Sequence, residues 1–361
     1  MQPRPEVLGL VPAVHGSAPR SAGDVLDFSV SSNPLGPAPG VLAAARAAAL
    51  GRYPEPESAT LRGALAERLD LPAERVVVGN GSVELIWLLA LAFLERGDRA
   101  LVVGPTFAEY ARAARLMGAE VSEYRAAPAD GFRLDLAALC SAIRAAQPRL
   151  TFLCNPNNPT GAYLTRGEVE ALLAATPGLL ALDEAYVRFV DGAWDVRPLL
   201  QHDRLVVLRS LTKDHALAGV RLGYALGAPA VMRAIQWAQP PWSVNAAAQA
   251  AGLAALREDE HVARGRALAA QAKDYLVRGV RPLGLAALPS AGNFFLVAVP
   301  NAAELAGALR ERGIYVRDCT SFGLPGHLRL AARPLDECDA LLAALRRTPS
   351  LVPAMASGDR R

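Results

Sequence analysis

The chain has 361 residues, of which 52% are hydrophobic and 20% charged, the composition of a globular rather than a disordered protein. Its net charge of +3, without any tract of basic residues, predicts no nucleic-acid partner. The longest apolar run, residues 85–94, is about half as long as a membrane-spanning helix, so no membrane association is predicted.

The first part of the chain shows an alternation of helical and strand patterns. Residues 1–40 are rich in Pro, Gly and Ser and predict an irregular arm, and an Ala-rich helix is expected at 41–50. Short apolar strands bounded by helices are expected at 75–79, 99–104, 119–124, 149–155, 179–186 and 204–210. Such strands, linked by crossover helices, predict an α/β fold with a large domain, residues 41–245, built on a mainly parallel sheet.

Beyond residue 245 the pattern changes. A long helical stretch at 246–280 is followed by a strand at 291–299, a helix at 302–312, strands at 314–318 and 327–332, and a helix at 334–347. This order predicts a smaller α+β domain, residues 246–348, with the arm 1–40 packed on it. Residues 349–361 are expected to form a flexible tail.

The cysteines and the N-terminus bear on location. The four cysteines are scattered, without the spacing of a Cys/His metal site, and the N-terminus lacks the long apolar core of a signal peptide. We therefore expect a cytoplasmic protein without a structural metal.

Lysine is the scarcest charged residue. Of the 38 basic residues only Lys213 and Lys273 are lysines. Lys213 follows a predicted strand, at the edge where open α/β sheets bind ligands, and a partly buried lysine there can form a Schiff base. Ser210 and Arg221 offer a hydroxyl and a guanidinium to a phosphate. The competing interpretation of Lys213 is a surface lysine on a loop. Lys273, on a predicted helix, is expected to be a solvated surface residue.

The segment Ser210-x-x-Lys213 also matches the nucleophile motif of serine β-lactamases and penicillin-binding enzymes. Those enzymes need a further Lys-Thr-Gly strand, and Lys273 is followed by Asp-Tyr. That interpretation therefore fails.

Three further segments follow predicted strands. Residues 79–82 (Gly-Asn-Gly-Ser) lead into a helix whose N-terminus favours a phosphate, although an ordinary strand–helix connection has the same pattern. Residues 155–161 (Asn-Pro-Asn-Asn-Pro-Thr-Gly) are equally typical of a turn and of a site. Asp183 ends an apolar strand, where a carboxylate needs a cationic or hydrogen-bonding partner, whereas Glu184 points to the other face and could be solvated.

Together with Pro105-Thr106-Phe107 and Tyr110, these segments resemble the class I/II aminotransferase superfamily of pyridoxal-phosphate enzymes. The motifs occur in the family's order, and the resemblance covers nearly the whole chain. It implies fold type I, pyridoxal 5'-phosphate as cofactor, and a homodimer with active sites at the subunit interface.

The resemblance also implies roles for individual residues. Lys213 would bind the cofactor covalently, and Asp183 would pair with its pyridine nitrogen. Asn158 and Tyr186 would hydrogen-bond the ring oxygen, and Tyr110 would stack on the ring.

Five residues would bind the cofactor's phosphate. Tyr53 would reach across from the partner subunit, and the others belong to the same chain: Gly81, Ser82, Ser210 and Arg221. Arg329 would bind the α-carboxylate of the substrate.

Two branches of the superfamily look similar. The expected one is L-threonine-O-3-phosphate decarboxylase of cobalamin biosynthesis, which residues 15–16, 107–110, 240–245 and 316–322 resemble. The alternative is histidinol-phosphate aminotransferase of histidine biosynthesis, which residues 32–37, 52–54 and 217–219 resemble. A third hypothesis, a non-catalytic regulator on the same fold, is disfavoured because the cofactor residues are present.

The substrate is expected to be a small, phosphorylated, amino-acid-like molecule. Arg317 and Arg329 are predicted on neighbouring strands and suit two anionic groups. The other expected substrate contacts are Asn33, His15, Gly16 and Asn158. The residues leave open whether a carboxylate or a proton departs from the substrate's Cα, and what Asp214 and His215 do beside Lys213.

Overall fold

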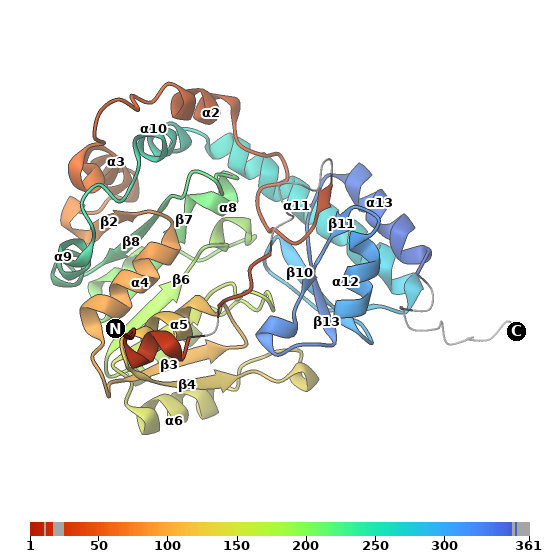
Figure 1. The fold of residues 1–361 in the computed structure, drawn as a ribbon, viewed down its shortest axis with the longest axis horizontal. Coiled ribbons are helices and arrows are strands. Elements are labelled where there is room, and N and C mark those ends of the chain that lie inside the picture. Colours follow the sequence, from red (N-terminus) through yellow and green to blue (C-terminus); the bar gives the residue numbers. More distant parts are fainter. Residues whose placement is uncertain (11, 17–24, 349–350, 352–361) are drawn as a thin grey trace, which may run out of the picture.

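The computed structural model describes residues 1–10, 12–16, 25–348 and 351. The expected flexible tail, 349–361, lies outside the described residues except for Leu351, as does part of the arm. Two sheet-bearing parts lie side by side, and the arm runs between them before it reaches α2 (Pro39–Arg46) (Figure 1).

The larger part contains a seven-stranded sheet in the order β2-β8-β7-β6-β5-β3-β4. Its strands are β2 (Val76–Gly79), β3 (Arg99–Gly104), β4 (Glu120–Arg125), β5 (Leu150–Cys154), β6 (Leu179–Asp183), β7 (Leu205–Ser210) and β8 (Gly223–Gly227). The pairs from β4 to β7 are parallel, which confirms the predicted mainly parallel sheet. The short β8, with a glycine at each end, was not predicted, and it pairs antiparallel with both β2 and β7.

Both faces of this sheet are buried. Along β6, Leu180 and Leu182 lie in one core cluster and Leu179 and Ala181 in another. One face packs against α2, α3 (Ala59–Leu69), α6 (Leu136–Ala146), α7 (Arg166–Ala175) and α10 (Ala246–Ala255), and the other against α4 (Ser82–Phe93), α5 (Glu109–Leu116) and α9 (Pro229–Ala238). Because successive side chains of a strand point to opposite faces, strands covered on both sides are apolar throughout.

The smaller part contains an antiparallel sheet in the order β12-β13-β10-β9. Its strands are β9 (Ala286–Ala287), β10 (Phe294–Ala298), β12 (Arg317–Asp318) and β13 (His327–Ala331), and its helices are α11 (Asp259–Val280), α12 (Ala302–Arg310) and α13 (Leu335–Arg346). The arm contributes β1 (Leu26–Asp27), which pairs with β11 (Ile314–Tyr315).

The predicted helix at 246–280 is two helices, α10 and α11, separated by residues 256–258. Ala248, Ala251 and Ala255 of α10 pack in the core of the seven-stranded sheet, not in that of the smaller part. We therefore propose that the boundary between the domains lies at 256–258 rather than at 245. Within the described residues, no helix is both long and apolar enough to cross a membrane.

Candidate active site

Lys213 lies at the carboxyl edge of the seven-stranded sheet. It belongs to α8 (Leu211–Asp214), a single helical turn that directly follows β7. Ser210 caps this turn, because its side chain accepts a hydrogen bond from Thr212 N at 3.3 Å. Such an edge is where ligands of α/β sheets bind.

A cavity at this edge gathers eight of the predicted cofactor residues: Ser82, Tyr110, Asn158, Asp183, Tyr186, Ser210, Lys213 and Arg221. Its other lining residues are Val83, Phe107, Cys154, Ala185 and Thr212. Lys213 Nζ lies 5.7 Å from the centre of the Tyr186 ring. Within the described part of the chain this amine donates no hydrogen bond to another residue, and it lines the cavity.

Asp183 is a buried acid with a defined orientation. It ends β6 and is 4% exposed. One carboxylate oxygen accepts the Tyr110 hydroxyl at 2.8 Å, and the other accepts Ala185 N at 2.9 Å. Burial raises the pKa of Asp183, whereas these hydrogen bonds and the charge of Lys213 act in the opposite direction. A buried carboxylate of this kind fits a cationic partner such as a protonated ring nitrogen.

The ring of Tyr110 packs parallel to Phe152, with 5.1 Å between the ring centroids. Its hydroxyl is turned to Asp183. Its stacking on the cofactor ring stays a prediction.

A compact cradle for an anion lies at the start of α4. Gly81 has a φ of +78°, and a Cβ atom there would lie 2.7 Å from Arg221 Nη2. The guanidinium of Arg221 is therefore held against the N-terminus of α4, where unpaired backbone N–H groups favour a phosphate. Ser210 Oγ and Thr212 Oγ1 are 2.6 Å apart and add two hydroxyls. Thr212 was missed from the sequence, although a second hydroxyl two residues after Ser210 could have indicated it.

The loop at 155–161 belongs to the site rather than being only a turn. Asn157 Nδ2 donates to Pro105 O and to Thr160 Oγ1, both at 2.9 Å, and so fixes the loop. Asn158 lines the cavity and accepts a hydrogen bond from Arg329 Nη1. Asn158 thereby connects the cavity to the smaller part of the molecule.

Arg317 and Arg329 lie directly opposite each other on β12 and β13. Arg329 is 5% exposed, and its Nη2 donates to Ser29 O at 2.7 Å. Its buried Nε has no hydrogen-bond partner among the described residues. Arg317 donates to Val14 O and Ser321 Oγ. Burial lowers the pKa of Arg317, and the charge of Arg329 lowers it further. Two adjacent buried cations favour an anionic ligand.

Asn158 lines the cavity but the two arginines do not, and neither do the other predicted substrate residues, His15, Gly16 and Asn33. His15 Nε2 lies 3.2 Å from Glu109 Oε1, and a Cβ atom on Gly16 would lie 2.6 Å from Ser29 O. Asn33 is 2% exposed, and both ends of its amide have protein partners. Substrate contacts of these three residues stay predictions.

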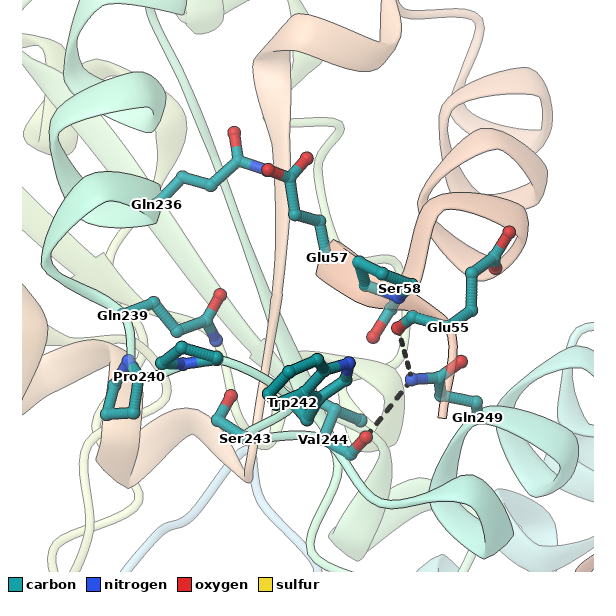
Figure 2. Close-up of a pocket in the computed structure, with 12 residues that line it drawn as sticks. Glu55, Glu57, Ser58, Gln236, Gln239, Pro240, Trp242, Ser243, Val244 and Gln249 are labelled. Carbon is teal, nitrogen blue, oxygen red and sulfur yellow. Dashed lines mark hydrogen bonds between the residues drawn. The ribbon is translucent and has the colours of Figure 1, made fainter. Parts of the chain in front are cut away.

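Tyr53 lies outside the cavity of its own chain. It is 79% exposed and stacks on Trp242, with 4.7 Å between the ring centroids. Trp242 also lines a separate pocket between the segment 55–58 and the loop 239–244 (Figure 2). Gln249 Nε2 joins the two walls of that pocket through Glu55 O and Val244 O.

The structure corrects the expectation for Lys273 and decides the open alternative for Glu184. Lys273 is not a solvated surface residue: it is partly buried and donates to Ser290 O at 2.6 Å and Gly292 O at 3.0 Å. Glu184 is not solvated either, because it is 2% exposed and pairs with Arg209 at 2.8 Å. In both cases the partner lies outside the local segment, at least 17 residues away in the chain.

The cavity and the sheet together are those of a fold type I enzyme that uses pyridoxal phosphate. A family model described as aminotransferase class I and II matches residues 23–345, and the chain belongs to that family. Pyridoxal 5'-phosphate is its cofactor, and the residues of the cavity fit it: a free lysine, a buried carboxylate and an anion cradle.

The chain is similar to several histidinol-phosphate aminotransferases. It is 43% identical over 329 residues to that of Symbiobacterium thermophilum, covering 90% of both chains. It is 39% identical over 359 residues to that of Anaeromyxobacter sp., covering 95% of this chain and 98% of the relative. The structure of the enzyme from Sinorhizobium meliloti in complex with pyridoxal-5'-phosphate matches with a TM-score of 0.85 and 27% identity, covering 96% and 97% of the two chains.

The expected branch, the threonine-phosphate decarboxylase of cobalamin biosynthesis, is wrong. Relatives at 34–43% identity carry the name of the alternative branch. The segments that favoured the decarboxylase are short, and two neighbouring arginines suit many anionic substrates. They therefore could not distinguish the two reactions.

Proposed function

We propose that the protein is a histidinol-phosphate aminotransferase, which moves an amino group between histidinol phosphate and a 2-oxo acid. The observation that carries the proposal is the similarity of the chain to histidinol-phosphate aminotransferases at 34–43% identity. The Arg317–Arg329 pair, which adjoins the cavity through Asn158, supplies the cationic site that such a substrate needs. Histidinol phosphate carries an amine and a phosphate ester but no carboxylate. The arginines would therefore bind its phosphate in one half of the reaction and the carboxylates of the oxo acid in the other.

In this proposal the residues of the cavity bind different groups of the cofactor. Gly81, Ser82, Ser210 and Arg221 hold the phosphate of the cofactor. The carboxylate of Asp183 keeps a proton on the ring nitrogen. When bound, pyridoxal phosphate would supply an electron sink for the substrate carbon that bears the amine.

Lys213 would carry the proton in the reaction. Its amine, when not bound to the cofactor, would accept the proton from that carbon as a general base. A guanidinium cannot replace it, because it neither deprotonates nor forms a Schiff base. Tyr186 and Asn158 would orient the ring by hydrogen bonds to its oxygen.

We further propose a homodimer in which Tyr53 reaches the cofactor phosphate of the partner subunit. Tyr53 and Trp242 are large aromatic side chains that lie exposed in the single chain, and Leu50 and Trp237 are exposed as well. Aromatic side chains are enriched at protein interfaces. A cytoplasmic location is part of the proposal, and the four cysteines, all described, are free and buried.

The test is amino-group transfer by the purified protein supplied with pyridoxal phosphate. We expect consumption of histidinol phosphate that depends strictly on an added 2-oxo acid, with formation of the corresponding amino acid. Phosphothreonine without oxo acid is the control and should release no carbon dioxide. A cofactor-loaded protein that transfers amino groups from other donors but not from histidinol phosphate would overturn the proposed substrate.

A further inference from the structure

The turn that carries Lys213 ends on two carbonyl groups that both accept hydrogen bonds from one distant residue, although Ala216 N also donates to the carbonyl of Lys213, at 3.3 Å. Asn33 N donates to Lys213 O at 2.8 Å, and Asn33 Nδ2 donates to Asp214 O at 2.9 Å. The last carbonyl groups of a helical turn have no hydrogen-bond partner within the turn. Here Asn33, which is 181 residues from Asp214 in the chain, supplies one. We infer that Asn33 is a positioning residue for Lys213 and that Gly265 holds it in place. The inference rests on the proposed role of Lys213.

Asn33 has no freedom to leave this position. Its Oδ1 accepts a hydrogen bond from Leu35 N at 3.0 Å, and its carbonyl accepts one from Gly36 N at 3.0 Å. The preceding carbonyl, that of Ser32, accepts Asn293 Nδ2 at 3.0 Å. The side-chain amide of Asn33 therefore links the arm to the lysine turn.

Helix α11 closes the remaining side. A Cβ atom at Gly265 would lie 2.1 Å from Asn33 Oδ1 and 2.3 Å from Asn33 Nδ2. Only glycine lets the helix backbone come this close to the amide. The arm, α8 and α11 meet at this point, and Figure 1 shows the arm passing beside α11. Gly265 thus fixes the position of Asn33, and Asn33 in turn fixes the position of the lysine turn.

The chemistry of asparagine suits this task. Its amide donates from Nδ2 and accepts at Oδ1 at the same time. Aspartate has the same shape but cannot donate to Asp214 O when it is ionised. A general base must lie within hydrogen-bond reach of the proton that it takes. A displaced turn would therefore impair proton transfer by Lys213 more than it impairs substrate binding.

The test compares the holoenzyme with Asn33→Asp, Asn33→Ala and Gly265→Ala. We expect kcat to fall about tenfold in each, the loss expected for one buried hydrogen bond, with KM for the amino donor within about twofold. Gly307→Ala is the matched control, because Gly307 also lies in a helix and a Cβ atom there meets nothing within 4 Å. It should leave kcat unchanged.

A double variant tests whether Gly265 acts through Asn33. With alanine at position 33 the clash is gone, so Gly265→Ala should cause no further loss in the Asn33→Ala background. Additive losses would show that Gly265 acts elsewhere. Unchanged kcat in Asn33→Asp, or a rise in KM with kcat intact, would overturn the inference.

Borohydride reduction followed by peptide mass analysis separates this inference from the proposed site. The cofactor should be trapped on Lys213 in the unaltered protein, and the trapped fraction should fall in Asn33→Ala but not in Gly307→Ala. Trapping on another residue would overturn the role of Lys213. Full trapping on Lys213 in every variant, together with unchanged kcat, would overturn only the role of Asn33.

Discussion

Arg317 and Arg329 face each other directly in the register of β12 and β13, so two guanidinium groups share one end of the smaller sheet. Arg329 also donates hydrogen bonds to Asn158, in the loop that follows β5, and to Ser29 of the arm. One arginine thus contacts all three parts of the chain that surround the candidate site. An anion bound to Arg329 would therefore be connected, through this arginine, to the larger part, the smaller part and the arm.

Replacing Arg329 by lysine should weaken substrate binding. Lysine keeps the charge but lacks the planar fork that binds a phosphate through two hydrogen bonds. We expect KM for histidinol phosphate to rise about 100-fold, as for the loss of a charged hydrogen bond, while the visible absorbance of the bound cofactor is unchanged. Arg312→Lys, at an exposed arginine, is the control. An unchanged KM in Arg329→Lys would place the phosphate elsewhere.

The two lysines should have separable effects. Lys213→Met should abolish the covalent cofactor without large loss of stability. Lys273→Met should keep the cofactor but lower the free energy of unfolding by about 2 kcal/mol, because Ser290 O and Gly292 O lose a charged donor. Cofactor absorbance and denaturant unfolding of both variants measure the difference. Loss of cofactor only in Lys273→Met would reverse the assignment.

Mixed dimers test the role of Tyr53. If Tyr53 completes the partner's site, the Tyr53→Ala dimer lacks the phosphate contact in both sites, and the Lys213→Ala dimer lacks the lysine in both. A dimer of one subunit of each has one intact site, formed by Lys213 of the first and Tyr53 of the second. We expect activity to return when the two inactive proteins are exchanged into mixed dimers. If mixing restores no activity although mixed dimers form, Tyr53 does not complete the site of the partner subunit.

His215 should make the protein less stable in mild acid. It is 7% exposed, and burial lowers its pKa below the ordinary value of 6.5, although the nearby Asp214 acts in the opposite direction. Below pH 6.5 the unfolded chain therefore binds a proton that the folded chain does not, and stability falls as the pH falls. The slope attributable to this histidine is at most about 1.4 kcal/mol per pH unit.

Urea unfolding of His215→Gln between pH 7 and pH 5 measures this contribution. The variant should lose less stability over that range than the unaltered protein. His202→Gln, at an exposed histidine, is the control. Equal pH dependence in His215→Gln and the unaltered protein would contradict the prediction.

Much of the fold follows from local patterns. The apolar strands and the helices between them predict the mainly parallel sheet, because periodicity reflects which faces are buried. The short β8 and the division between α10 and α11 escaped prediction. Glycine-bounded β8 has little apolar signal, and three residues between two Ala-rich helices leave no visible break.

The sequence by itself determined the class of chemistry. Only one lysine follows a buried strand, and the motifs around it occur in the order of one family. The tertiary structure alone decided how that lysine is held, which arginines are neighbours, and that Lys273 and Glu184 are structural. These facts depend on contacts such as Asn33 with Asp214, between residues far apart in the chain. Local patterns record which faces are buried, but not which distant atoms meet there.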